Sequence, residues 1–266
     1  MRLVVYLLIS ISTLSMISVN ASDEDTTQEI APSRGGTALT QEELDSLIGQ
    51  YGEIEEIPEG FQFTEAEIKL WHGDHLANIK QPLSLYYEFI KLGTLEDGFS
   101  DSVYLKILEL NEDGSKNAML DFFTGYSKQV VTPDNVTNIT GNPVLGIFLN
   151  GDVKVMSRLT KGNPRHFRNR IGISLREEAV VESTTFIFNG KEYQGEKIYF
   201  SPYLNDPYRR KFEKYADKYY EFIFSDDIPG SLYQIKTVIP DRSKEETAEP
   251  LILEILTLID VRANES

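Results

Sequence analysis

The chain has 266 residues, a formal net charge of −16 at pH 7 and no cysteine. A surface this acidic repels polyanions over most of its area, so we predict no nucleic-acid partner. The lack of cysteine excludes disulfides, thiol nucleophiles and thiolate metal sites, and leaves burial of apolar side chains, including 14 Tyr and 14 Phe, to hold the fold.

The first 21 residues have the features of a secretory signal peptide. Arg2 precedes an apolar stretch diluted by serines, and Val19-Asn20-Ala21 is a small-residue cleavage site. This apolar stretch is too short and too polar to favour a transmembrane helix. We therefore expect the signal peptide to be cleaved and the mature chain to have no integral membrane span. Residues 22–38 are polar and acidic and predict a flexible leader. We expect residues 39–262 to form a single domain in a bacterial periplasm.

Two capping boxes open the predicted folded part. Thr40-x-x-Glu43 and Thr64-x-x-Glu67 each precede apolar residues at helical spacing, which predicts two short helices, the second ending at Pro82. The apolar period then changes to two, and this change predicts strands over residues 85–91, 103–110 and 118–123. The last two of these strands flank a hairpin turn at 111–114.

The middle of the chain predicts helices with clear starts. Asn142-Pro143 and Asn163-Pro164 each place an N-cap residue before a proline at the first helical position. Asp206-Pro207 repeats this pattern and predicts a third helix through about Tyr215.

Five further strands are predicted around and after these helices. Asn189-Gly190 is the strongest short hairpin signal in the chain, and Asp226-Asp227 begins a turn. The five strands span residues 180–188, 192–200, 219–224, 232–239 and 251–261. The order of elements predicts an α+β fold: a curved antiparallel sheet, or incomplete barrel, with helices inserted between strand groups and packed on one face.

A basic segment stands out in this acidic chain. Residues 153–176 contain no Asp or Glu and seven Lys or Arg. Arginine side chains match carboxylates, phosphates and lipid headgroups, and Arg165 and Arg168 fall in the first turns of a helix, where an anion is favoured. The segment therefore predicts an anion site that includes Arg158, Arg165 and Arg168. The alternative is a solvated helix face that pairs with acidic loops.

Aromatic residues cluster around the third predicted helix. Most of them should belong to the core, because large aromatic side chains dominate burial. Some tyrosines could instead line an apolar pocket with their polar tips, and we assign Tyr203 and Tyr208 to such a ligand pocket.

Evidence for catalysis is sparse in this sequence. No stretch matches a hydrolase elbow, a zinc-protease motif or a glycine-rich phosphate loop, so we predict no catalytic residue and no cofactor. His72 and His75 are three residues apart and could share a metal, with Asp74 or His166 as a further ligand. The alternative is a helix C-terminus at which His72 caps carbonyl groups.

The order of elements resembles that of the periplasmic lipoprotein-carrier (LolA-like) proteins over about residues 85–261. The resemblance implies an incomplete antiparallel barrel with a helical lid over a cavity for acyl chains. Residues 74–79, 148–153 and 225–230 resemble segments of an uncharacterised family of exported bacterial proteins. No functional residue of the carriers aligns with this chain, so none is transferred.

These observations predict a non-enzymatic binding or carrier protein for a hydrophobic or amphiphilic anionic ligand, such as a lipid. The first alternative is an assembly factor that docks on an envelope protein partner through the basic helix. The second alternative is a metal-dependent enzyme with His72 and His75 as ligands.

Overall fold

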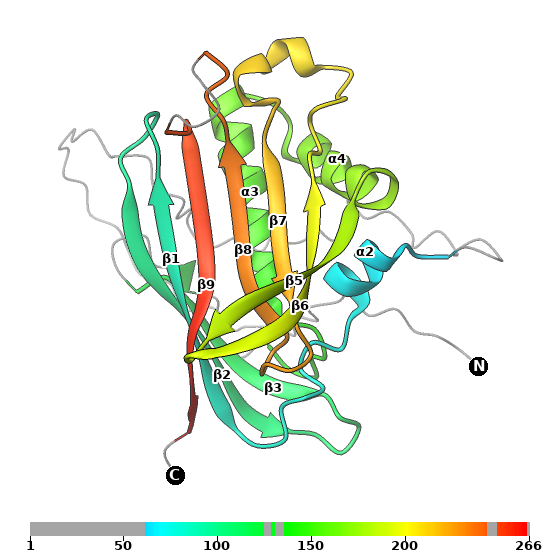
Figure 1. Ribbon diagram of the computed structural model, residues 1–266, viewed down its shortest axis with the longest axis vertical. Helices are drawn as coiled ribbons and strands as arrows, with labels where there is room; N and C mark the ends of the chain where they lie inside the picture. Colours follow the sequence, from blue (N-terminus) through cyan, green and yellow to red (C-terminus); the bar gives the residue numbers. More distant parts are fainter. Residues whose placement is uncertain (1–61, 125–128, 131–135, 244–248, 265–266) are drawn as a thin grey trace, which may run out of the picture.

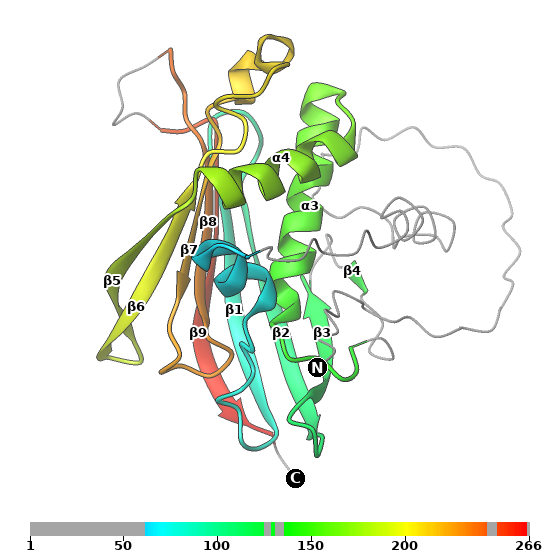
Figure 2. The same ribbon diagram turned by 90° about the vertical axis from the view of Figure 1, so that its right-hand side faces the viewer.

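A nine-stranded antiparallel sheet with helices on one of its faces forms the body of the molecule (Figures 1 and 2). The computed structural model describes residues 62–124, 129–130, 136–243 and 249–264. The predicted α+β class and the helices packed on one face are confirmed. The signal peptide, the leader and the helix after Thr40 lie outside the described residues.

Strands β1 and β9, from the two ends of the described chain, are neighbours in the middle of the sheet. The strand order is β4-β3-β2-β1-β9-β8-β7-β6-β5, so the sheet is open, with β4 and β5 at its edges. The strands are β1 (Leu83–Leu92), β2 (Phe99–Leu110), β3 (Lys116–Phe122), β4 (Gln129–Val130), β5 (Val180–Phe188), β6 (Lys191–Phe200), β7 (Tyr219–Phe224), β8 (Leu232–Ile239) and β9 (Ile252–Ala263). Eight of these strands were predicted, and the two-residue β4 was not.

The two long helices begin where the Asn-Pro pairs predicted. α3 (Pro143–Thr160) and α4 (Pro164–Glu177) follow N-caps Asn142 and Asn163, whose side chains accept hydrogen bonds from the backbone N–H groups of the first turn. The Asn142 side chain also donates to the Tyr87 hydroxyl at 3.0 Å and to the Gly230 carbonyl at 3.0 Å. The cap of α3 is therefore tied to β1 and to the β7–β8 turn.

The core lies between the sheet and α3, which runs along the strands on the face that the helices cover (Figure 2). Phe89 of β1 packs against Phe148 of α3, with ring centroids 6.5 Å apart, and against Phe123 at 4.9 Å. Neighbouring strands add a row of stacked rings in which Phe200 and Phe222 each lie within 6.4 Å of Tyr220. Most of the clustered aromatic residues belong to the core, as predicted.

Two predicted helices are wrong in length. The helix after Thr64 keeps its capping box but consists of α2 (Glu65–Glu67) and a π-helical turn, η1 (Ile68–His72). It ends there because Gly73 is extended, with φ −69° and ψ 138°. Among the residues described, no helix has both the length and the apolar character needed to span a bilayer.

The third predicted helix is replaced by two short 3₁₀ turns, η3 (Arg209–Lys211) and η4 (Glu213–Tyr215). Asp206 accepts a hydrogen bond from the Tyr208 N–H at 2.7 Å, as expected of an N-cap, but Phe212 has φ −142° and interrupts the helical path. Residues 201–217 therefore form a protruding lobe at the end of the sheet where β7 begins (Figure 1). We refer to these residues as the lobe.

Candidate functional site

The three arginines predicted to bind an anion do not converge on one point. Arg158, near the end of α3, lies 2.7 Å from a carboxylate oxygen of Glu96 in the β1–β2 turn. Arg168 donates to the side chain of Asn150 at 3.3 Å. Arg165 is exposed in the first turn of α4. Two of the three are thus engaged by groups within the chain, and their part in ligand binding stays a prediction.

The two predicted tyrosines have opposite environments. Tyr203 is fully buried, and its hydroxyl lies 3.3 Å from that of Tyr220. Burial, together with the nearby carboxylate of Asp152, raises the pKa of Tyr203 well above its ordinary value. Tyr208 is 54 % exposed on the lobe, with its ring centroid 5.4 Å from that of His166. Only Tyr208 is accessible to a ligand from solvent.

The remaining arginines of α4 bind the helix to the rest of the fold. Arg170 donates to the carbonyl of Pro202 at 3.2 Å, and Arg176 lies 2.8 Å from Glu67 of α2. Burial alone would raise the pKa of Glu67, but hydrogen bonds from Arg176 and Thr64 lower it below its ordinary value. Several arginines of α4 therefore hold this helix to neighbouring parts of the fold.

The predicted histidine pair is split between surface and core. The exposed His72 packs its ring against Phe63, with centroids 4.0 Å apart. His75 is buried; its Nδ1 accepts from the Asn142 N–H at 3.1 Å and its Nε2 lies 2.6 Å from the Lys69 carbonyl. Both ring nitrogens of His75 thus have partners in the protein. Within the described ranges, no three His, Asp or Glu side chains group as metal ligands.

A row of polar side chains crosses the covered face of the sheet beneath α3. Tyr220, Thr237, Glu254 and Lys91 are successive cross-strand partners on β7, β8, β9 and β1, and each is at most 2 % exposed. The Thr237 hydroxyl donates to Glu254 at 3.3 Å, and Lys91 lies 4.0 Å from the other Glu254 oxygen. Buried polar groups require such partners, because without them burial is unfavourable.

α3 and the β1–β2 turn supply ionic partners to both ends of this row. At the β7 end, Asp152 of α3 pairs with the buried Lys218 and accepts from the Tyr220 hydroxyl at 2.5 Å. At the β1 end, Glu96 lies 2.5 Å from Lys91. Burial alone would raise the pKa of Glu96, but hydrogen bonds from Lys91 and Arg158 lower it. These contacts tie the helix to the sheet.

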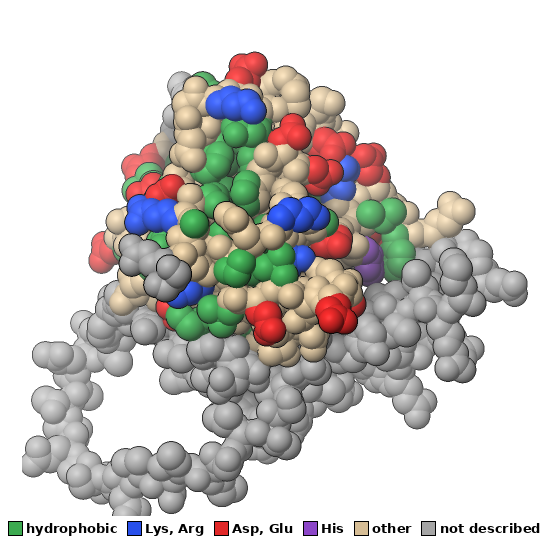
Figure 3. All heavy atoms as spheres, turned by 90° about the horizontal axis from the view of Figure 1, so that it is seen from below, with side chains coloured by type: hydrophobic (Ala, Val, Ile, Leu, Met, Phe, Trp, Pro, Cys, Tyr) green, Lys and Arg blue, Asp and Glu red, His purple; other side chains and the backbone are tan. Residues whose placement is uncertain are grey.

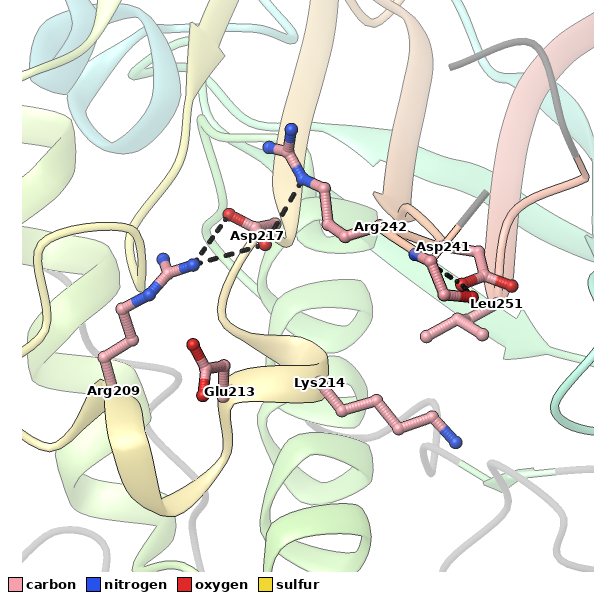
Figure 4. Close-up of a pocket in the computed structure, with 8 residues that line it drawn as sticks. Arg209, Glu213, Lys214, Asp217, Asp241, Arg242 and Leu251 are labelled. Carbon is pink, nitrogen blue, oxygen red and sulfur yellow. Dashed lines mark hydrogen bonds and ion pairs between the residues drawn. The ribbon is translucent and has the colours of Figure 1, made fainter. Parts of the chain in front are cut away.

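A cleft of about 670 Å³ opens between the lobe on one side and residues 241–243 and 251 on the other (Figure 4). Its lining combines cations, carboxylates and one apolar side chain. The lining residues are Arg209, Glu213, Lys214, Asp217, Asp241, Arg242, Ser243 and Leu251. None of the five residues predicted to bind ligand lines this cleft.

Two guanidinium groups meet at a single carboxylate in the cleft. Figure 4 shows Arg209 and Arg242 reaching Asp217 from opposite sides, at 3.1 Å and 3.3 Å. The Asp217 side chain is 9 % exposed, whereas that of Arg242 is 71 % exposed. In the described part of the chain, the contacts of Arg242 involve only its Nε, so its terminal N–H groups are available to a ligand.

The sequence contained only a weak signal for this cleft. Arg209, Lys214 and Arg242 lie in segments that also contain acidic residues, so their local charge is close to balanced. The acid-free run at 153–176 is the stronger charge pattern in the sequence. The juxtaposition of the lobe with residues 241–243 is a tertiary feature without a local pattern.

No family model matches the chain, and no curated protein matches it. In structure it resembles Mycobacterium tuberculosis lipoprotein LppX at 11% identity and a TM-score of 0.29, over 76% of this chain and 96% of LppX. It also resembles a LolA superfamily protein from Nitrosomonas europaea at 9% identity and a TM-score of 0.19, over 76% of this chain and 95% of that one. The resemblance expected from element order is thus found, but at these TM-scores it carries no functional inference.

Proposed function

We propose that the protein is an exported, non-enzymatic carrier that binds an amphiphilic anion, with the anionic group in the cleft between Arg209, Lys214 and Arg242. The observation that carries the proposal is the pair of guanidinium groups positioned by Asp217 at the wall of an open cleft. A carboxylate that fixes arginine side chains in advance reduces the conformational entropy lost when a ligand binds. Arginine is also suited to bidentate recognition of carboxylate and phosphate.

The charges around the cleft favour a headgroup with a low charge. The lining contains three basic side chains and three acidic ones, Glu213, Asp217 and Asp241. A compact polyanion would be repelled by these carboxylates, whereas a singly charged carboxylate or phosphate ester can bind beside Arg242 without approaching all of them. The cleft therefore fits a monoanionic group better than an inorganic polyphosphate.

The apolar part of the ligand would begin at Leu251. This residue lines the cleft, directly precedes β9 and belongs to the hydrophobic core, with 9 % of its surface exposed. An alkyl chain that contacts Leu251 gains free energy from the apolar surface it removes from water. Contact with both Leu251 and Arg242 selects for an amphiphile.

Docking of an envelope protein through the basic helix has less support. Arg168, Arg170 and Arg176 contact groups within the chain, so a partner would have to compete with those contacts. Arg165 is the fourth arginine of α4. It is exposed, and within the described part of the chain its side chain has no contact shown.

The proposal can be tested with dodecyl phosphate as the probe and isothermal titration calorimetry as the measurement. We expect binding to the wild-type protein, and affinity lower by about tenfold or more in a Lys214→Ala/Arg242→Ala variant, because each charged hydrogen bond contributes about 1.5–3 kcal/mol. Dodecyl maltoside, with the same chain and no charge, should bind weakly to both proteins.

Arg262→Ala is the matched control, because Arg262 is an exposed arginine on β9, paired with Asp260 rather than facing the cleft. It should leave the affinity unchanged. Absence of dodecyl phosphate binding to the wild type, or an equal loss in the control, would overturn the proposal. Native mass spectrometry of protein purified from its host should also show a co-purifying anionic amphiphile.

A further inference from the structure

The lobe exposes two large apolar side chains at one end of the molecule. Leu204 is 43 % exposed and Tyr208 is 54 % exposed. The lobe stands beyond the ends of the strands in both side views (Figures 1 and 2). Exposed side chains on the lobe can contact a flat surface that approaches this end of the molecule.

Exposed basic residues accompany these two residues on the lobe and at the start of α4. Arg210 and Lys211 are exposed on the lobe, and the Lys211 Nζ lies 4.8 Å from the ring centroid of Tyr208. The start of α4 lies beside the lobe, because the ring of His166 packs against Tyr208. The exposed Arg165 is the neighbour of His166 in the first turn of α4.

The local charge is opposite in sign to that of the whole chain. Residues 161–170 and the lobe together contain eight Lys or Arg and three Asp or Glu, a formal charge of +5, whereas the chain carries −16. Viewed from below, the opposite end shows basic side chains scattered singly among acidic and hydrophobic ones (Figure 3). The lobe and the start of α4 are therefore a locally basic region of an acidic chain.

We propose that the lobe and the start of α4 form a peripheral docking surface for an anionic lipid bilayer. The basic residues are attracted to the surface potential of anionic lipids, at about 1 kcal/mol for each Lys or Arg close to the surface. Tyr208 has the apolar body and polar tip that are favoured at the interface between lipid and water, and Leu204 adds apolar contact. The acidic remainder of the protein is repelled and turns the lobe toward the membrane.

A bilayer fits this surface better than a nucleic acid or a protein groove. The docking surface lies on a protruding lobe and combines exposed apolar side chains with cations, and a lipid interface offers both apolar contact and negative charge over a broad area. The proposal does not depend on the ligand of the cleft. Arg209 and Lys214 face the cleft from the other side of the lobe, so docking would place the mouth of the cleft beside the membrane.

Vesicle co-sedimentation tests the docking surface. The protein used is the full chain in the form that its host produces. We expect binding to vesicles of phosphatidylglycerol mixed with phosphatidylcholine and not to phosphatidylcholine alone. Binding should decline when the salt concentration rises from about 0.05 to about 0.5 M, because the screening length shortens. An Arg210→Glu/Lys211→Glu variant should bind at least about tenfold more weakly, and Leu204→Ser/Tyr208→Ser several-fold more weakly.

A Lys80→Glu/Lys106→Glu variant controls for net charge, since both lysines are exposed and lie before and within the early strands, away from the lobe. It should keep wild-type binding, and circular dichroism should show the same fold in all variants. Equal binding to neutral and anionic vesicles, or an equal loss in the control and in Arg210→Glu/Lys211→Glu, would overturn the proposal. None of these variants removes a residue that lines the cleft, so failure here leaves the carrier proposal open to its own test.

Discussion

Ionic groups occur in two contrasting settings at the same end of this protein. Beneath α3, Asp152 and Lys218 are at most 1 % exposed and pair with each other. In the cleft beside the lobe, Arg242 is 71 % exposed and contacts Asp217 of the lobe through a single nitrogen. Similar chemistry therefore serves two purposes: the buried pair joins helix to sheet, whereas the exposed arginine retains donors for a ligand.

The contrast follows from the energetics of desolvation. A buried charge without its partner is strongly unfavourable, so the groups beneath α3 depend on one another for stability. An exposed ion pair contributes little to stability because water solvates either member alone. Function that needs accessible charge can therefore evolve at the lobe with little effect on the fold.

The largest effect is expected from breaking the buried pair. Asp152→Leu leaves the Lys218 ammonium without its carboxylate and removes the acceptor of the Tyr220 hydroxyl. We expect the free energy of unfolding in urea to fall by about 3–5 kcal/mol. The double variant Asp152→Leu/Lys218→Met should recover part of this loss, because no unpaired charge is then buried. A loss below about 1 kcal/mol in the single variant would remove the contrast between buried and exposed pairs.

An intermediate effect is expected from the titration of His75. Burial lowers the pKa of this imidazole below its ordinary value of 6.5. The unfolded chain therefore takes up the proton first as the pH falls through 6.5, so stability is highest above that pH and declines on acidification. The slope from this group is at most about 1.4 kcal/mol per pH unit.

Urea denaturation as a function of pH measures the contribution of His75. His75→Gln should flatten the decline below pH 6.5, whereas His72→Gln, at an exposed position, should change it less. A steeper decline in His75→Gln than in the wild type would contradict the sign of the shift.

The smallest effect is expected at the exposed arginine of the cleft. Arg242→Ala removes an exposed side chain whose partner, Asp217, keeps its contact with Arg209. The free energy of unfolding should change by less than about 1 kcal/mol. If the same urea measurement gave a fall of more than about 2 kcal/mol in the free energy of unfolding, Arg242 would have a structural role. The contrast between the buried and the exposed ion pair would then be wrong.

Local signals in the sequence predicted the elements well. The Asn caps of α3 and α4 were confirmed because each cap depends on residues within three positions. The Asn189-Gly190 turn joins β5 and β6 with φ of 50° and 74°, the left-handed values that such two-residue turns require. The third helix failed because Asp206-Pro207 specifies only a helix start, not its continuation.

The site was harder to predict because its residues meet only in the folded chain. The acid-free run at 153–176 suggested an anion site, but Arg158 and Arg176 meet Glu96 and Glu67, which are 62 and 109 residues away in sequence. Conversely, residues 209–217 join residues 241–243 across a long interval to form the cleft. Charge patterning locates basic residues but not the carboxylates that neutralise them.

The central claim is that an amphiphilic anion binds in the cleft, and the most direct measurement is an NMR titration of the protein with dodecyl phosphate. We expect the largest changes in backbone amide shifts in residues 209–217 and 241–243. Amides along α3 should change little, since their contacts with the sheet stay intact. Largest changes along α3, or no saturable change at all, would contradict the account.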